Sequence, residues 1–138
     1  MSQIEVNDMC FACGSENPIG LHLRFEAAGP GRVSCAFTPE DNHQGWKGTV
    51  HGGLVATLLD EAMAWAVLSS GTKAVTAKME VRWRIPVPVG EVLRLEGEVV
   101  SSKGRAVEAK SALYLRDGRL GAEARGVFMC VDGMEEST

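Results

Sequence analysis

The sequence predicts an α+β fold in which an antiparallel sheet of about six strands wraps around one long central helix. Residues 51–68 are rich in Ala and Leu and are apolar around most of the predicted helical circumference. Segments that alternate apolar and polar residues lie before and after this stretch, and short Gly-containing turns separate most of them. A helix that is apolar on most sides cannot lie on a surface, so the sheet is expected to curl around it.

The strands are predicted from their period of two. Residues 21–25 and 33–37 alternate on either side of the turn GPGR and predict a hairpin. Residues 76–85 show the clearest alternation, which puts Ala77, Met79, Val81, Trp83 and Ile85 on one face and Thr76, Lys78, Glu80, Arg82 and Arg84 on the other. Three further strands are predicted at 91–100, 105–116 and 119–131, separated by SSKG and DG.

Length and composition predict one domain over residues 1–138, with 1–20 as an ordered lead-in and 132–138 as a frayed tail. The net charge of -4 argues against binding to nucleic acid. The N-terminus has neither a basic start nor an apolar stretch, and no run reaches the ~18 uninterrupted apolar residues of a membrane span. A cytoplasmic protein that does not bind membranes is therefore expected.

Two of the four cysteines have a spacing found in zinc sites. Cys10 and Cys13 form the motif CFACG, but a structural zinc site needs four ligands, and no second pair completes it. His22 or His43 would be the further candidates. We expect no metal and small, reduced, buried thiols in a docked N-terminal segment, while a metal at this pair stays an open alternative.

The predicted helix carries two adjacent carboxylates in its middle, Asp60 and Glu61. At ~100° per residue, one broad face holds Leu54, Val55, Leu58, Leu59 and Trp65. Asp60 falls nearly opposite that face, between the small residues Ala56 and Ala64, where a ligand or another backbone can come close. A working carboxylate and a simple solvated face are both compatible with this pattern.

The helix begins with two glycines. The backbone N–H groups of Gly52 and Gly53 have no intrahelical partners, and the helix dipole adds partial positive charge there. Such donors suit an oxygen that becomes negative in a transition state, as in acyl transfer. The alternative is that the glycines only permit a tight turn into the helix.

Gly52 and Asp60 cannot act on the same carbonyl within one chain. Eight residues of helix separate them by ~12 Å along the axis, whereas a donor and a base must each lie within about 3 Å of the reacting atoms. Two antiparallel helices related by a two-fold axis would bring Gly52 of one chain opposite Asp60 of the other. If the protein is a catalyst, a homodimer is required.

The strings HGGLVATLLDEAMAWA, NHQGWKGTV and TAKMEVRWRIPVPVGE strongly resemble the hotdog-fold acyl-CoA thioesterases, especially the phenylacetyl-CoA thioesterase-like (PaaI-like) group. The N-terminal CFACGSENPIGLHLRF is similar to a variant within the same superfamily, so the resemblance covers about residues 10–131. It implies a hotdog fold, a homodimer or homotetramer, and hydrolysis of an acyl- or aryl-CoA to CoA and a carboxylic acid without a cofactor.

By position, the resemblance makes Gly52 the residue whose N–H polarises the thioester carbonyl and Asp60 the catalytic carboxylate from the partner subunit. Asp60 would act either as general base or as nucleophile. Thr76 matches a residue that helps to hold the attacking water. Relatives often carry an amide six residues before the His of HGG, where this chain has Gly45. The neighbouring amide, Gln44, is the candidate for positioning the water.

Other candidate site residues follow from side-chain chemistry. His51 is a candidate base by residue type, although the resemblance implies that it shapes the turn. Glu61 is interpreted mainly as a helix or interface residue. The candidates for contact with CoA phosphates are Arg82, Arg84 and Arg105, and the candidates for an acyl pocket are Trp46, Trp65 and Met63, with surface exposure or ordinary packing as the alternatives.

Two other functions remain as alternatives. A non-catalytic acyl-CoA-binding module would share the fold and the ligand. A hotdog dehydratase or hydratase would pair a His with an acid, but His51 and Asp60 are too far apart on one helix to form such a pair within a chain.

Overall fold

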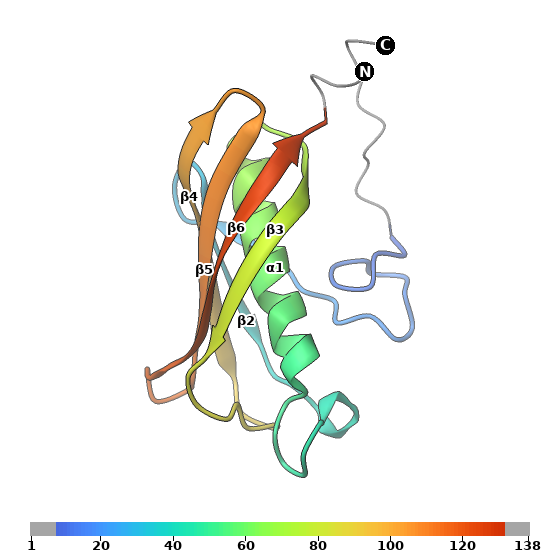
Figure 1. Cartoon of the computed structure of the whole chain (residues 1–138). Helices are drawn as coiled ribbons and strands as arrows, with labels where there is room; N and C mark the ends of the chain where they lie inside the picture. Colours follow the sequence, from blue (N-terminus) through green and yellow to red (C-terminus); the bar gives the residue numbers. More distant parts are fainter. Residues whose placement is uncertain (1–7, 132–138) are drawn as a thin grey trace.

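The computed structural model describes residues 8–131, so the predicted frayed tail at 132–138 and the first seven residues of the lead-in lie outside the described part. One helix, α1 (Gly52–Ser69), lies against one face of a six-stranded antiparallel sheet in the order β1-β2-β4-β5-β6-β3 (Figure 1). The strands are β1 (Glu26–Ala27), β2 (Arg32–Phe37), β3 (Ala74–Trp83), β4 (Leu93–Lys103), β5 (Ala106–Tyr114) and β6 (Leu120–Cys130). A short 3-10 helix, η1 (Asp41–His43), precedes α1. The predicted α+β class and the wrapped helix are confirmed.

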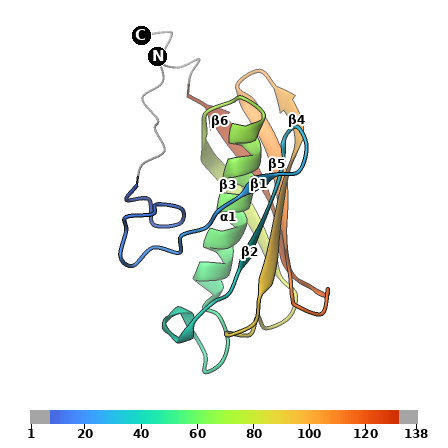
Figure 2. The ribbon, with the colours of Figure 1, turned by 180° about the vertical axis from the view of Figure 1, so that it is seen from behind.

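The core lies between α1 and the sheet, as Figure 2 shows from behind. The helix buries Val55, Leu58, Leu59, Ala62, Met63, Ala66 and Val67. Each large aliphatic side chain buried in this way contributes about 1.5–3 kcal/mol. The predicted apolar face is partly wrong at Trp65, which is only half-buried and stacks on Phe25 with ring centroids 6.4 Å apart. By length and hydropathy α1 would also fit a membrane span, a property that core helices share.

The helix and the sheet approach each other most closely at β4. A Cβ atom on Gly97 would lie 2.0 Å from the carbonyl oxygen of Ala62, so only glycine fits there. On the next strand the buried Ser111 donates its hydroxyl to the carbonyl oxygen of Leu59 at 2.9 Å. These two contacts fix the helix backbone on both sides of Asp60.

The strand predicted at 21–25 is wrong. His22 has a φ of +54°, a left-handed conformation that interrupts an extended chain. The N–H groups of Leu21 and Leu23 donate to the carbonyls of Phe11 and Ala12, each at 2.9 Å, instead of pairing with β2. Of the residues before the turn, only the two of β1 pair with β2, whose other edge pairs with β4. This stretch therefore ties the N-terminal segment to the body of the protein.

The alternation predicted for residues 76–85 contains an error at its start. A β-bulge shifts the register of β3 against β6 between Thr76 and Lys78. Thr76 pairs with the buried Phe128 and so lies on the helix side of the sheet, while Lys78 and the later polar residues lie on the outer side. Bulges redirect side chains in this way, and this one brings Thr76 to α1.

Candidate functional site

The start of α1 leaves one backbone donor unused. His51 is the N-cap, and its Nδ1 accepts a hydrogen bond from the N–H of Gly53 at 2.9 Å. The N–H of Leu54 donates to the carbonyl of His51 at 2.9 Å. Among residues 8–131, no partner is found for the N–H of Gly52. The predicted pair of donors is therefore reduced to Gly52, because Gly53 is occupied by the histidine.

Two neighbouring elements hold this helix start in place. Trp83, at the end of β3, donates its indole Nε1 to the carbonyl oxygen of Gly52 at 3.1 Å. In the preceding loop, the amide of Gln44 donates to the carbonyl of Asp41 at 2.8 Å and accepts from the N–H of Gly48. The nitrogen and the oxygen of the Gln44 amide thus both bind backbone groups of its own loop. These contacts do not support the predicted contact of Gln44 with a catalytic water.

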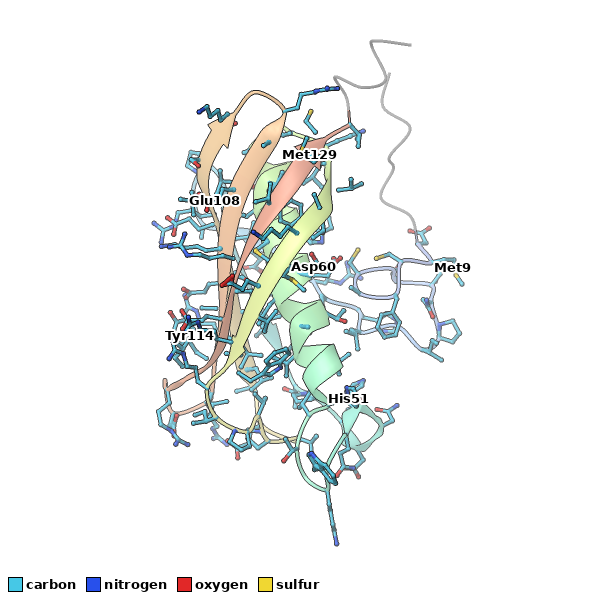
Figure 3. The ribbon with its side chains drawn as sticks, in the orientation of Figure 1. Met9, His51, Asp60, Glu108, Tyr114 and Met129 are labelled. Atoms are coloured by element: carbon cyan, nitrogen blue, oxygen red, sulfur yellow. The ribbon has the colours of Figure 1, made fainter. Side chains whose placement is uncertain are left out.

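Asp60 lies about halfway along α1, as the labelled side chains in Figure 3 show, whereas His51 lies at the helix start. Its Oδ1 accepts a hydrogen bond from the Thr76 hydroxyl at 2.8 Å. Asp60 is half-buried and Thr76 is exposed, so water and a ligand can reach the pair. The sequence comparison had connected Thr76 with the attacking water, and the structure shows it bound to the carboxylate itself.

Glu61 faces the N-terminal segment, whereas Asp60 contacts Thr76 on β3. Glu61 lies near the thiols of Cys10 and Cys13 in the N-terminal segment. Burial raises the pKa of Glu61, the negative charge of Asp60 raises it further, and a hydrogen bond from Trp65 partly offsets both effects. Burial also raises the pKa of Cys13 to about 12, with further contributions from Cys10 and Glu61. The sequence indicates a helix or interface residue at Glu61, and only the folded chain reveals these neighbours.

The arginines predicted to bind CoA do not converge within one chain. Arg82 and Arg84 line a groove of about 400 Å³ that also includes Glu96, Glu98 and Lys110, whose strand positions face away from the helix. Arg84 is paired there with Glu123 through two of its nitrogens. Arg105 lies in the β4–β5 turn, next to Cys130, at the end of the sheet where α1 finishes. A single phosphate site made of all three is thus not formed in this chain.

The predicted pocket residues also separate. Met63 is fully buried, and its Sδ and Cε would lie 3.2 Å from a Cβ on Gly126. In this chain it packs in the core, which agrees with the alternative of ordinary packing; its role in an acyl pocket stays a prediction. Trp46 is 87% exposed in the loop before α1, so it remains available to a ligand or to another chain.

Strand β3 forms an open edge of the sheet and pairs only with β6 in the described chain. Apolar side chains are exposed along it, among them Val75 at 45% and Trp83 at 56%. Long apolar edges favour pairing with another strand. Asp60, Thr76 and Gly52 all lie beside this edge, either on β3 or bonded to it.

Comparison with known proteins agrees with the fold and identifies the family. Residues 47–122 match the family model of the thioesterase superfamily. Human acyl-coenzyme A thioesterase 13 is 31% identical over 102 residues, which cover 72% of this chain and 73% of the human protein.

Solved structures share the fold of this chain. A crystal structure described as a thioesterase superfamily protein superimposes with a TM-score of 0.82 and 30% identity, over 86% of this chain and 61% of that one. The Escherichia coli PaaI protein of the phenylacetic acid degradation operon has a TM-score of 0.75 at 20% identity, over 80% of both chains. At that identity the PaaI likeness concerns the fold.

Proposed function

This chain belongs to the thioesterase superfamily, and from that premise we propose that it hydrolyses the thioester bond of acyl-CoA substrates. The observation that carries the proposal is the hydrogen bond between Thr76 and Asp60, which presents a carboxylate on the open side of the helix. The name of the human relative gives the substrate class. The Asp60 carboxylate and the unpaired N–H of Gly52 supply the two chemical functions that such a hydrolysis needs.

In the reaction that we infer, the N–H of Gly52 donates to the thioester oxygen as negative charge develops on it. As general base, Asp60 takes a proton from water while the water oxygen bonds to the carbonyl carbon. The C–S bond then breaks, and the CoA thiolate takes up the proton from Asp60. As nucleophile, Asp60 would instead bond to the carbonyl carbon and expel the thiolate, and water would hydrolyse the resulting anhydride. Neither route draws on a metal or a cofactor.

The two groups are proposed to come from different subunits of a homodimer. They are separated by ~12 Å along α1, which is too far for one carbonyl. The exposed apolar edge of β3 supports pairing with a second copy, since edge-to-edge contact would cover Val75 and Trp83 and bring the two helices side by side. Assembly of dimers into a tetramer and a location in the cytoplasm belong to the same proposal.

The activity is tested by following thiol release from a panel of aryl and straight-chain acyl-CoAs. Asp60→Asn keeps the size of the side chain and can still accept the Thr76 hydroxyl, but it is neither a base nor a nucleophile. We expect turnover to fall by at least about 100-fold, as for loss of general acid–base catalysis, while binding of CoA is retained. Tight binding with no turnover by the wild type would instead favour a non-catalytic acyl-CoA-binding module.

Subunit sharing is tested with Gly52→Pro, which removes the N–H at the first helical position, where proline is well tolerated. Gly52→Ala is the matched control, because its Cβ would meet nothing nearer than Trp83 at 3.5 Å and the N–H remains. Mixing equal amounts of inactive Gly52→Pro and Asp60→Asn chains should restore about one quarter of wild-type activity, since half of the dimers are mixed and each has one intact site. No recovery after subunit exchange would contradict the shared site.

A further inference from the structure

We propose that Cys10, Cys13 and Glu61 form a zinc site that joins the N-terminal segment to α1. Their ligand atoms, two Sγ and a carboxylate oxygen, all lie within 4.8 Å of one another. No other group of three His, Cys, Asp or Glu residues comes as close within residues 8–131. The proposed ion would link two segments of the chain through three protein ligands, and the proposal does not depend on the thioesterase activity.

The turn that carries the two cysteines is shaped to direct both sulfurs to one point. The N–H of Cys13 donates to the Sγ of Cys10 at 3.4 Å, and the N–H of Gly14 donates to the carbonyl of Cys10 at 2.8 Å. A Cβ on Gly14 would lie 2.4 Å from the carbonyl oxygen of Asp8, so the tight turn requires glycine there. Hydrogen bonds from backbone amides to a ligand sulfur orient it and support its thiolate form.

The third ligand comes from the helix and closes the site. All three side chains are half-buried, and neither cysteine is in a disulfide. Without a cation, two thiols and a carboxyl group share a confined space in which their ionised forms repel one another. Thiolates favour zinc over magnesium or calcium, and a tetrahedral zinc site needs its ligand atoms about 3.7 Å apart. Small side-chain rotations from the present positions would achieve that spacing.

The fourth position is assigned to water. The histidines considered from the sequence are used elsewhere, because His22 Nε2 lies 2.8 Å from the carbonyl of Asn17 and His43 Nδ1 accepts from the N–H of Glu40 at 2.8 Å. A zinc ion here would fix the N-terminal segment, from residue 8 onward, against the middle of α1, the helix that carries Asp60. Figures 1 and 2 both show this segment lying alongside the helix.

The test is metal stoichiometry on the full chain after reduction and chelation. Reduction first removes any Cys10–Cys13 disulfide. Zinc is then added, excess metal is removed by gel filtration, and bound zinc is counted by mass spectrometry. The wild type should retain about one zinc per chain, and the double variant Cys10→Ser with Cys13→Ser should retain none. Cys130→Ser is the matched control, since Cys130 is also half-buried and free but lies on β6, and it should retain zinc as the wild type does.

Glu61→Gln tests the third ligand. Its affinity for zinc, measured by competition with a chromophoric chelator, should fall by more than about tenfold, the loss that even an outer-shell partner causes. Wild-type protein loaded with cobalt should show a sulfur-to-cobalt charge-transfer band. This band reports cobalt–thiolate bonds in the unsubstituted protein, so the test does not depend on correct folding of the serine variant. The site is refuted if reduced wild type lacks this band or binds no more zinc than the serine variant. Equal affinity in Glu61→Gln would refute the three-ligand arrangement.

Discussion

Replacing Gly97 by alanine should move the central helix away from the sheet. The new Cβ would lie 2.0 Å from the carbonyl oxygen of Ala62 and 2.5 Å from its carbonyl carbon. Ordinary van der Waals contact begins at about 3.5 Å, so the helix and β4 must separate by more than about 1 Å. A backbone carbonyl cannot rotate away as a side chain can, and the cost therefore falls on the packing around Leu58 and Leu59.

Overpacking a core typically costs about 1–3 kcal/mol, and we expect Gly97→Ala to reach at least about 3 kcal/mol because the obstacle is backbone. For a chain of this size that corresponds to a fall in melting temperature of about 10 °C. Because Ala62 is two residues after Asp60, the same displacement should disturb the Thr76 contact and reduce thiol release in the protein that remains folded.

The assay is chemical denaturation followed by circular dichroism, with Gly126→Ala as the matched control. A Cβ on Gly126 would lie 3.2 Å from the flexible end of Met63 and 3.1 Å from the carbonyl of Lys78, so its cost should be about 1 kcal/mol. Gly97→Ala unfolding within 1 kcal/mol of the wild type, or no more easily than Gly126→Ala, would refute the inferred tightness of the helix–sheet contact.

Three further predictions concern the site. Thr76→Val should lower kcat/KM about 5- to 30-fold by removing the hydrogen bond to Asp60. Thr76→Ser keeps the hydroxyl and should have a kcat/KM near that of the wild type. Equal rates of thiol release for the two variants would count against the contact. In the presence of a chelator, Glu61→Gln should have a higher melting temperature than the wild type at neutral pH, and the difference should shrink toward pH 4. A raised carboxyl pKa in the folded chain stabilises the fold while the group is protonated, and this stabilisation is lost as the pH rises through the pKa of the folded state. Thermal melts at several pH values check this. Without the chelator, added zinc should raise the melting temperature of the wild type more than that of Glu61→Gln. Trp83→Phe should reduce turnover by loosening the start of α1 at Gly52 while leaving the fold intact by circular dichroism.

Most of the secondary structure and the main candidate residues could be predicted from the sequence, because both depend on local properties. Hydrophobic periodicity located the helix and five of the six strands to within about three residues. The glycine that begins the helix and the acid nine positions after His51 were also readable, since a helix has a fixed rise and its first N–H groups lack partners. The same rise predicts that a catalytic site would need a second chain, and this homodimer stays a prediction.

Which of those groups keep a free hydrogen-bonding position, and which contact one another, depends on the folded chain. The bulge that turns Thr76 toward Asp60 arises from pairing with β6, more than fifty residues away, and a strict period of two gave the opposite face. The left-handed His22, the capping of Gly53 by His51 and the approach of Glu61 to Cys10 and Cys13 likewise have no signature in local periodicity. Such contacts join segments distant in sequence or depend on individual side-chain geometry, and folding alone brings them together.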